Sequence, residues 1–140
     1  MIVLDTNVLS ELMRPKPSAP VVAWIAQQPL ADLFTTTITE AEIFYGIELL
    51  AQGKRHDALL AAAEGMFTED FAGRVLAFES EAARHFARIA AHRRALGRPV
   101  SHADAQIAAI ARAHGAKLAT GNGPDFADCS ITVIDPWRVP

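Results

Sequence analysis

Acidic and amide side chains recur in this sequence at the points where predicted strands and helices meet. Asp5 directly follows a short apolar run, and Glu42 and Asp104 each lie in the first turn of a predicted helix. Asn122 and Asp125 lie in the loop that follows another predicted strand. Because the carboxyl ends of parallel strands and the starts of the helices after them share one edge of a sheet, we expect these side chains to gather there.

A group of carboxylates at one edge of a sheet indicates a particular chemistry. Like charges in one cleft repel, so such a cluster persists only when protons or cations neutralise it. Mg²⁺, with Mn²⁺ as a substitute, prefers oxygen ligands and keeps water molecules that can contact a substrate phosphate. Such an ion activates water and stabilises the charge that develops during phosphodiester hydrolysis. The sequence therefore favours a metal site formed by Asp5, Glu42 and Asp104.

Each of these side chains also has a purely structural interpretation. Residues 39–42 and 101–104 both fit the capping-box pattern or its aspartate variant, in which the acid satisfies a backbone donor at a helix start. Asp5 alone is a suitable helix N-cap, and Asp125 is a common turn residue. Their expected placement at one edge, and no single motif, is what favours the catalytic interpretation.

Short apolar strands alternate with helices along the chain. β-Branched and apolar runs predict strands at 2–4, 33–37, 74–78, 117–120 and 131–134. Apolar spacing predicts helices after residue 5, at 21–28, from 39 to Gly53, at 54–67, at 79–96 and from Ser101 to Gly115. This alternation is typical of an α/β fold, and we expect three α/β/α layers with a short parallel sheet.

Length and composition restrict the class of protein. The chain has 140 residues, a size that predicts a single domain at 1–140. Its formal net charge of −3 argues against binding nucleic acid mainly through a broad basic field. We identify no secretory leader and no apolar run long enough for a membrane, and the single Cys129 suits a reducing compartment. We therefore expect a cytoplasmic protein.

Segments spread over nearly the whole chain match the motifs of a known family. They are 1–10, 39–42 with Gly46, 103–108, 118–122 followed by 125–126, and 135–137. In order and spacing, these segments resemble the PIN domains, and among them the VapC and FitB toxins of bacterial toxin–antitoxin pairs. Each motif is weak alone, and their combination is specific.

The resemblance implies an endoribonuclease toxin that cuts structured RNA with Mg²⁺ or Mn²⁺ and is inhibited by a VapB-like antitoxin. We also expect a homodimer that contacts operator DNA only through the antitoxin. Asp5, Glu42 and Asp104 would take the metal-site roles. Many PIN domains have an acid at the fourth site position, where this sequence has Asn122. Asn122 and Asp125 are therefore both candidates to complete the catalytic set.

Three polar residues after the first strand are candidates for supporting roles. Thr6, Asn7 and Ser10 could orient Asp5 or a water molecule on the metal through hydroxyl or amide contacts. Ordinary helix-start residues are the alternative interpretation of the same three positions.

Two further groups of residues have open alternatives. Arg84, Arg88 and His92 lie four residues apart on the longest predicted helix, near Arg93 and Arg98. They could follow a phosphate backbone, although a solvated helix face is the interpretation that we favour. Several apolar positions could serve the core, a homodimer contact or an antitoxin groove, namely Trp24, Ile25, Phe44, Tyr45 and Leu49.

Two other functions are alternatives to the nuclease. A haloacid-dehalogenase-type phosphatase also uses an aspartate after its first strand, but it needs a second aspartate two residues on, where this sequence has Asn7. A catalytically weak PIN-like module would act only by binding a partner. Metal-dependent RNA cleavage by the purified protein separates that module from the enzyme.

Overall fold

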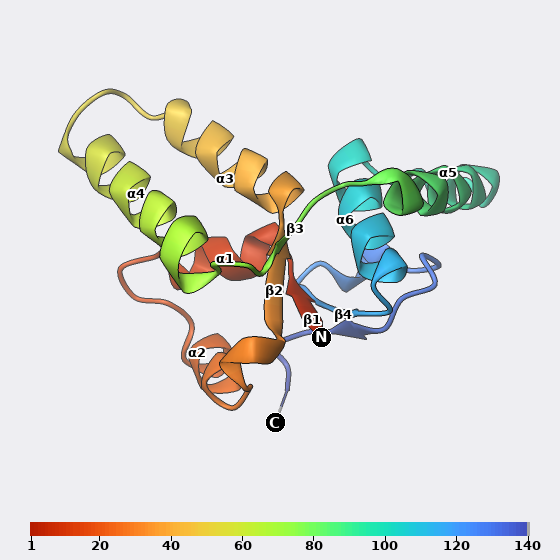
Figure 1. Cartoon of the computed structure of the whole chain (residues 1–140), viewed down its shortest axis with the longest axis horizontal. Coiled ribbons are helices and arrows are strands. Elements are labelled where there is room, and N and C mark those ends of the chain that lie inside the picture. Colours follow the sequence, from red (N-terminus) through yellow and green to blue (C-terminus); the bar gives the residue numbers. More distant parts are fainter. Residues whose placement is uncertain (140) are drawn as a thin grey trace.

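The computed structural model describes residues 1–139 and has a five-stranded sheet at its centre (Figure 1). The strands are β1 (Ile2–Leu4), β2 (Leu33–Thr36), β3 (Val75–Leu76), β4 (Lys117–Ala119) and β5 (Val133–Ile134). They lie in the order β3-β2-β1-β4-β5, and every neighbouring pair is parallel. The predicted α/β class with a short parallel sheet is confirmed.

Helices cover both faces of the sheet (Figure 1). One side holds α1 (Thr6–Leu12), α2 (Ala19–Ala26), α3 (Thr37–Glu48) and α4 (Lys54–Gly65), and the other holds α5 (Ser80–Ala95) and α6 (His102–Ala113). Successive strand residues point to opposite faces. Val3 therefore packs in the core under α5 and α6, whereas Leu4 packs in the core under α1 to α4.

Three short helical segments connect the main elements. They are η1 (Leu30–Asp32), η2 (Met66–Asp70), which continues α4 with a π-helical turn, and η3 (Gly123–Phe126). Within residues 1–139, none of the helices has both the length and the apolar character that crossing a membrane requires.

The start of α3 differs from the prediction in a way that affects the site. The N-cap is Thr36, whose hydroxyl accepts a hydrogen bond from the backbone N–H of Thr39 at 3.1 Å, so the predicted cap at Thr39 is wrong. β2 runs into the helix without a loop, and several threonines there have the chemistry of a cap. Glu42 consequently lies in the second turn of α3, beyond the reach of a capping box.

Other element bounds shift by a few residues. α3 ends at Glu48, and Gly53 does not close it. Gly53 instead precedes α4 as its N-cap, with a φ of 153° that favours glycine. The predicted strand at 74–78 is shorter than expected, because only Val75 and Leu76 pair with β2.

The arginines of α5 do not all share one environment. Arg84 and Arg88 are exposed, as expected of a solvated face. Arg93 is buried, and its guanidinium donates to the backbone carbonyls of Asp125 and Ala127 at 3.0 and 2.8 Å. A solvated role for Arg93 is therefore wrong, because this side chain holds the chain around η3 against α5.

Candidate active site

Asp5, at the carboxyl edge of the sheet, has a carboxylate that accepts several hydrogen bonds. It follows β1, caps α1 and is only 3% exposed. Its Oδ1 accepts from the backbone N–H of Thr6 at 2.8 Å. Its Oδ2 accepts from the Thr120 hydroxyl at 2.8 Å and from the Asn7 amide at 3.2 Å. These donors come from α1 and from the residue that directly follows β4, and they fix the carboxylate at the end of the central strand.

Glu42 is oriented by a chain of hydroxyl groups. The Thr6 hydroxyl donates to Glu42 Oε1 at 2.7 Å, and Thr6 Oγ1 lies 3.0 Å from Thr39 Oγ1. A hydroxyl has one proton to donate, so Thr39 is the donor in the second contact. Although Glu42 is exposed, this chain ties α3 to the start of α1 and directs the carboxylate toward Asp5.

Asp104 comes to the same edge from α6. Its backbone N–H donates to the Ser101 hydroxyl at 3.2 Å, which confirms the predicted N-cap of this helix. Burial raises the pKa of the Asp104 carboxyl, and the negative charges of Asp125 and Glu42 raise it further. The cap therefore positions the helix, while the acid itself faces other acids.

One cavity of about 560 Å³ brings these residues together. It is lined by Asp5, Thr6, Asn7, Ser10, Glu11, Arg14, Glu42, Asp104, Asn122 and Trp137. Every predicted site residue lines this cavity except Asp125, which lies in η3 and acts on Asp104 through its charge. The expected gathering at the carboxyl edge of the sheet is thus found in the structure.

The electrostatics of the cavity centre on Asp5. The pKa of its carboxyl is raised from 3.8 to about 6, mainly by burial and further by the charges of Asp104 and Glu42. Hydrogen bonds from Thr120 and Thr6 lower the pKa but do not offset the burial. Negative charge in this cavity is therefore undercompensated, a condition that a bound cation would relieve.

The donor set suits a hard divalent cation. Carboxylate, amide and hydroxyl oxygens line the cavity, whereas thiol and imidazole ligands, which zinc prefers, do not. Among residues 1–139, no three His, Cys, Asp or Glu side chains lie close enough together to hold one metal ion. Mg²⁺ commonly binds one or two carboxylates and keeps several waters, so a pair of these acids is sufficient.

Some residues of the site are not evident from the sequence. The sequence predicts a helix cap at Thr39 and the last residue of a strand at Thr120, yet both hydroxyls belong to the hydrogen-bond networks around the acids. The place of Thr120 directly after a strand is a signal that could have indicated it, whereas Thr39, inside α3, has none beyond the capping pattern. Arg14 carries no such signal, and Trp137 is marked only by the family-like segment 135–137, which does not place it at the cavity.

Asn7 bears directly on the phosphatase alternative, which needs an acid at this position. Its amide nitrogen donates to Asp5, and its amide oxygen accepts from the backbone N–H of Gly121 at 3.1 Å. Asn7 thus links α1 to the chain after β4. An aspartate there could not donate to Asp5, so the geometry requires an amide.

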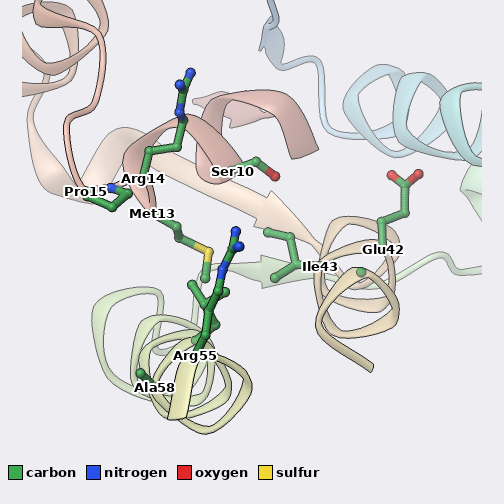
Figure 2. A pocket seen from close by; sticks show the side chains of 10 residues that line it. Ser10, Met13, Arg14, Pro15, Glu42, Ile43, Arg55 and Ala58 are labelled. Atoms are coloured by element: carbon green, nitrogen blue, oxygen red, sulfur yellow. The ribbon is translucent and has the colours of Figure 1, made fainter. Parts of the chain in front are cut away.

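A second, mainly apolar cavity of about 550 Å³ lies beside the first, between α1, α3 and α4. Figure 2 shows Met13, at the end of α1, and Arg55 on α4 directed toward each other, with Ile43 on α3 opposite them. Glu42 lines both cavities, as do Ser10 and Arg14. The acidic site therefore continues into an apolar groove.

The family model described as the PIN domain matches residues 2–130 of the chain. The chain belongs to the PIN-domain family. The resemblance noted in the sequence is thereby confirmed, and the expected order of strands and helices is that of a PIN domain.

This PIN domain is similar to several curated bacterial proteins, each aligned over 99% of both chains. The Plasmid stability protein StbB of Pseudomonas syringae pv. tomato is 44% identical. The VapC ribonuclease Y4jK of Sinorhizobium fredii is 39% identical, and the Toxin FitB of Neisseria gonorrhoeae is 38% identical.

Similarity extends to the fold. The crystal structure of FitAcB from Neisseria gonorrhoeae contains a chain that matches this PIN domain with a TM-score of 0.92 and 37% identity. The match covers 99% of this chain and 100% of that chain.

Proposed function

We propose that this PIN domain is a divalent-metal-dependent endoribonuclease and the toxin of a toxin–antitoxin pair. The observation that carries the proposal is the undercompensated charge around Asp5, whose pKa is raised to about 6 beside Asp104 and Glu42. The relatives named ribonuclease and toxin support the enzyme class. With RNA as substrate and one free thiol, at Cys129, the cytoplasm is the compartment that we assign.

A pair among Asp5, Asp104 and Glu42 would hold Mg²⁺, or Mn²⁺ in its place, and the third acid would add negative charge to the site. When bound, the ion supplies Lewis-acid stabilisation of the phosphodiester and an activated water nucleophile. Asn7 and Thr120 orient Asp5 through hydrogen bonds, in the manner of the outer shell of other metal sites. The protein thereby supplies a fixed geometry before the substrate binds.

Three further residues receive roles in this proposal. Thr6 positions Glu42 by donating to it. Asn122 lines the cavity and can offer an amide oxygen, whereas Asp125 contributes negative charge near Asp104 from outside the cavity. Ser10 lies at the boundary of the acidic and apolar cavities, where it can contact substrate.

The partner that we assign is a VapB-like antitoxin. The apolar cavity between α1, α3 and α4 fits an apolar segment of such a protein, and it shares Glu42 with the acidic site (Figure 2). An antitoxin segment in this cavity would lie next to the acids and obstruct them. Tyr45 and Leu49 on α3 are 67% and 69% exposed, and they remain available for a partner or a homodimer contact. Operator DNA would be bound through the antitoxin.

The decisive experiment pairs cleavage with folding in a Glu42→Gln variant. Because Glu42 lies beyond the first turn of α3, this change should alter the free energy of unfolding by less than about 1 kcal/mol. Cleavage of a structured RNA in Mn²⁺ should fall by about 10²-fold or more, because the lost charge helps to hold the cation. The measurements are thermal unfolding in EDTA and RNA cleavage in Mn²⁺.

Glu40→Gln is the matched control, since Glu40 lies one half-turn away on α3 and does not line the cavity. It should cleave RNA like the wild type. Cleavage by Glu42→Gln at the wild-type rate, or cleavage that EDTA does not abolish, would contradict the metal-dependent mechanism. A well-folded wild type that cleaves no RNA in Mn²⁺ would favour the partner-binding module.

A further inference from the structure

A smaller cavity of about 330 Å³ adjoins the acidic site, and within residues 1–139 it shares no lining residue with the apolar cavity. It is lined by Asn7, Gly121, Asn122, Asp135, Trp137 and Arg138. Asn7, Asn122 and Trp137 line both this cavity and the acidic one. A molecule that reaches the acids can therefore extend past Trp137 into this smaller cavity.

The indole ring of Trp137 is held in place by Gly121. A Cβ atom at position 121 would lie 2.8 Å from Cζ3 of the ring, closer than such contacts permit. The φ of Gly121 is outside the left-handed region, so the glycine is needed for space and not for backbone conformation. The Asp135 carboxylate also accepts from the backbone N–H of Trp137 at 3.0 Å, which fixes the turn that carries the ring.

Trp137 has polar neighbours in the acidic cavity. Among the described residues that line this cavity, it is the only aromatic one, and all the others are polar or charged. The side-chain amide of Asn122 makes no hydrogen bond to another residue within 1–139 and is exposed. Arg138 is 87% exposed, with Nε 3.6 Å from Asp135 Oδ2, so its guanidinium is accessible to an anion.

We propose that Trp137 and Asn122 form a subsite for one unpaired nucleobase of the RNA, adjacent to the phosphodiester that is cleaved. This inference rests on the proposed ribonuclease function. Single-stranded RNA is commonly bound by stacking bases on aromatic side chains and by hydrogen bonds to their edges. The Asn122 amide can both donate and accept, which suits a base edge better than a carboxylate would. Arg138 is placed to contact the neighbouring phosphate.

The first experiment observes Trp137 through its fluorescence. The other tryptophan, Trp24, is 6% exposed in α2, so Trp24→Phe leaves Trp137 as the one emitter. In a Trp24→Phe/Asp104→Asn variant with Mg²⁺, where cleavage is suppressed, a single-stranded oligoribonucleotide should quench the emission as it binds. Binding is followed independently through the anisotropy of a labelled oligoribonucleotide. If the oligoribonucleotide binds and the emission of Trp137 does not change, the proposed subsite is contradicted.

The second experiment tests whether Gly121 acts through the ring. Gly121→Ala and Trp137→Ala should each raise KM for single-stranded RNA by about 10- to 100-fold, the range expected for loss of one base–aromatic stack, with a small change in kcat. The double variant should be no worse than Trp137→Ala, and Trp137→Phe should retain most of the affinity. Gly123→Ala is the matched control, because a Cβ there meets nothing within 4 Å, and its KM should not change.

A substrate with one abasic nucleotide separates base binding from core packing. For the wild-type protein, KM should rise by the same factor of about 10 to 100 when the missing base is the one that occupies the subsite. For Trp137→Ala, removal of that base should not change KM. Equal sensitivity of both proteins, or a wild-type KM for Trp137→Ala, would show that Trp137 serves packing alone. If the wild type cleaves RNA but either of these results is found, the subsite is contradicted and the ribonuclease function is retained. If the wild type cleaves no RNA, both proposals are contradicted.

Discussion

Asp5 and Arg93 are both buried charged side chains, exposed by only 3% and 5%, but their surroundings differ. Arg93 donates to the backbone carbonyls of Arg98, Asp125 and Ala127 at 2.7 to 3.0 Å. Those partners are neutral carbonyl oxygens, they come from η3 and the loops beside it and after α5, and they accept from Nε and Nη1 of the guanidinium. Asp5 also accepts hydrogen bonds, but its remaining neighbours include two other acids.

The difference shows how a buried charge can serve structure or chemistry. Around Arg93 the backbone dipoles satisfy the cation, so the side chain joins α5 to the chain around η3 and needs no further ligand. Around Asp5 the pKa rises to about 6, because burial and like charges outweigh the hydrogen bonds. A site for a cation is expected where compensation within the protein is incomplete.

The largest effect expected from this comparison is on cleavage by Asp5→Asn. The amide keeps the shape of the side chain but removes the charge that would attract the cation, so RNA cleavage should fall by about 10²- to 10³-fold. The free energy of unfolding in EDTA should be unchanged or higher, because a buried charge is removed. Asp32→Asn, at an exposed position in η1, is the control and should cleave normally. A marked loss of stability in Asp5→Asn would make this carboxylate a structural group like Arg93.

Arg93→Met should have the opposite effects: a large loss of stability and a smaller loss of cleavage. Several buried carbonyls would lose their donor, and the free energy of unfolding should fall by about 2–4 kcal/mol. Cleavage per folded molecule should decrease less than in Asp5→Asn, since Arg93 does not line the acidic cavity. Chemical denaturation and cleavage assays test both statements. Arg94→Met, at the exposed neighbouring position, should retain wild-type stability.

The smallest effect concerns pH in the metal-free protein. The folded-state pKa of Asp5 is about 6 against 3.8 when unfolded, so the folded state binds the proton more tightly. The resulting stabilisation is complete below the unfolded pKa and is lost as pH rises through the folded one. In EDTA, lowering the pH from about 7 to about 5 should therefore add about 1 kcal/mol of stability through Asp5. Asp5→Asn should lack this increment, and saturating Mn²⁺ should reduce it. An identical pH dependence for wild type and variant would contradict the raised pKa.

Much of the fold and part of the site could be predicted because the signals are local. The apolar run before Asp5 marks a central strand, and the hydroxyl of Ser101 marks the start of α6. Alternation of strands with helices then predicts a parallel sheet whose carboxyl edge collects the acids. The shared edge predicts that Asp5, Glu42 and Asp104 lie together, and they line one cavity in the structure.

Other features depend on contacts between distant parts of the chain. Thr120 donates to Asp5 across 115 positions of sequence, and Trp137 packs on Gly121 from the last turn of the chain. Glu42 and Glu40 are both acids near the start of α3, and what distinguishes them is the contact of Glu42 with Thr6 and its place in the acidic cavity. No spacing rule predicts such contacts, because they follow from how helices pack on the sheet.

The sequence by itself determined the types of the elements, their order and the edge at which the acids meet, since hydrophobic periodicity and capping act over a few neighbouring residues. Only the tertiary structure decided which buried charges are compensated. Arg93 lies among exposed arginines in the sequence, yet packing turns it toward carbonyl groups, whereas the same packing leaves Asp5 facing other acids. That distinction is made by distances between side chains of different elements, and those distances exist only once the layers have assembled.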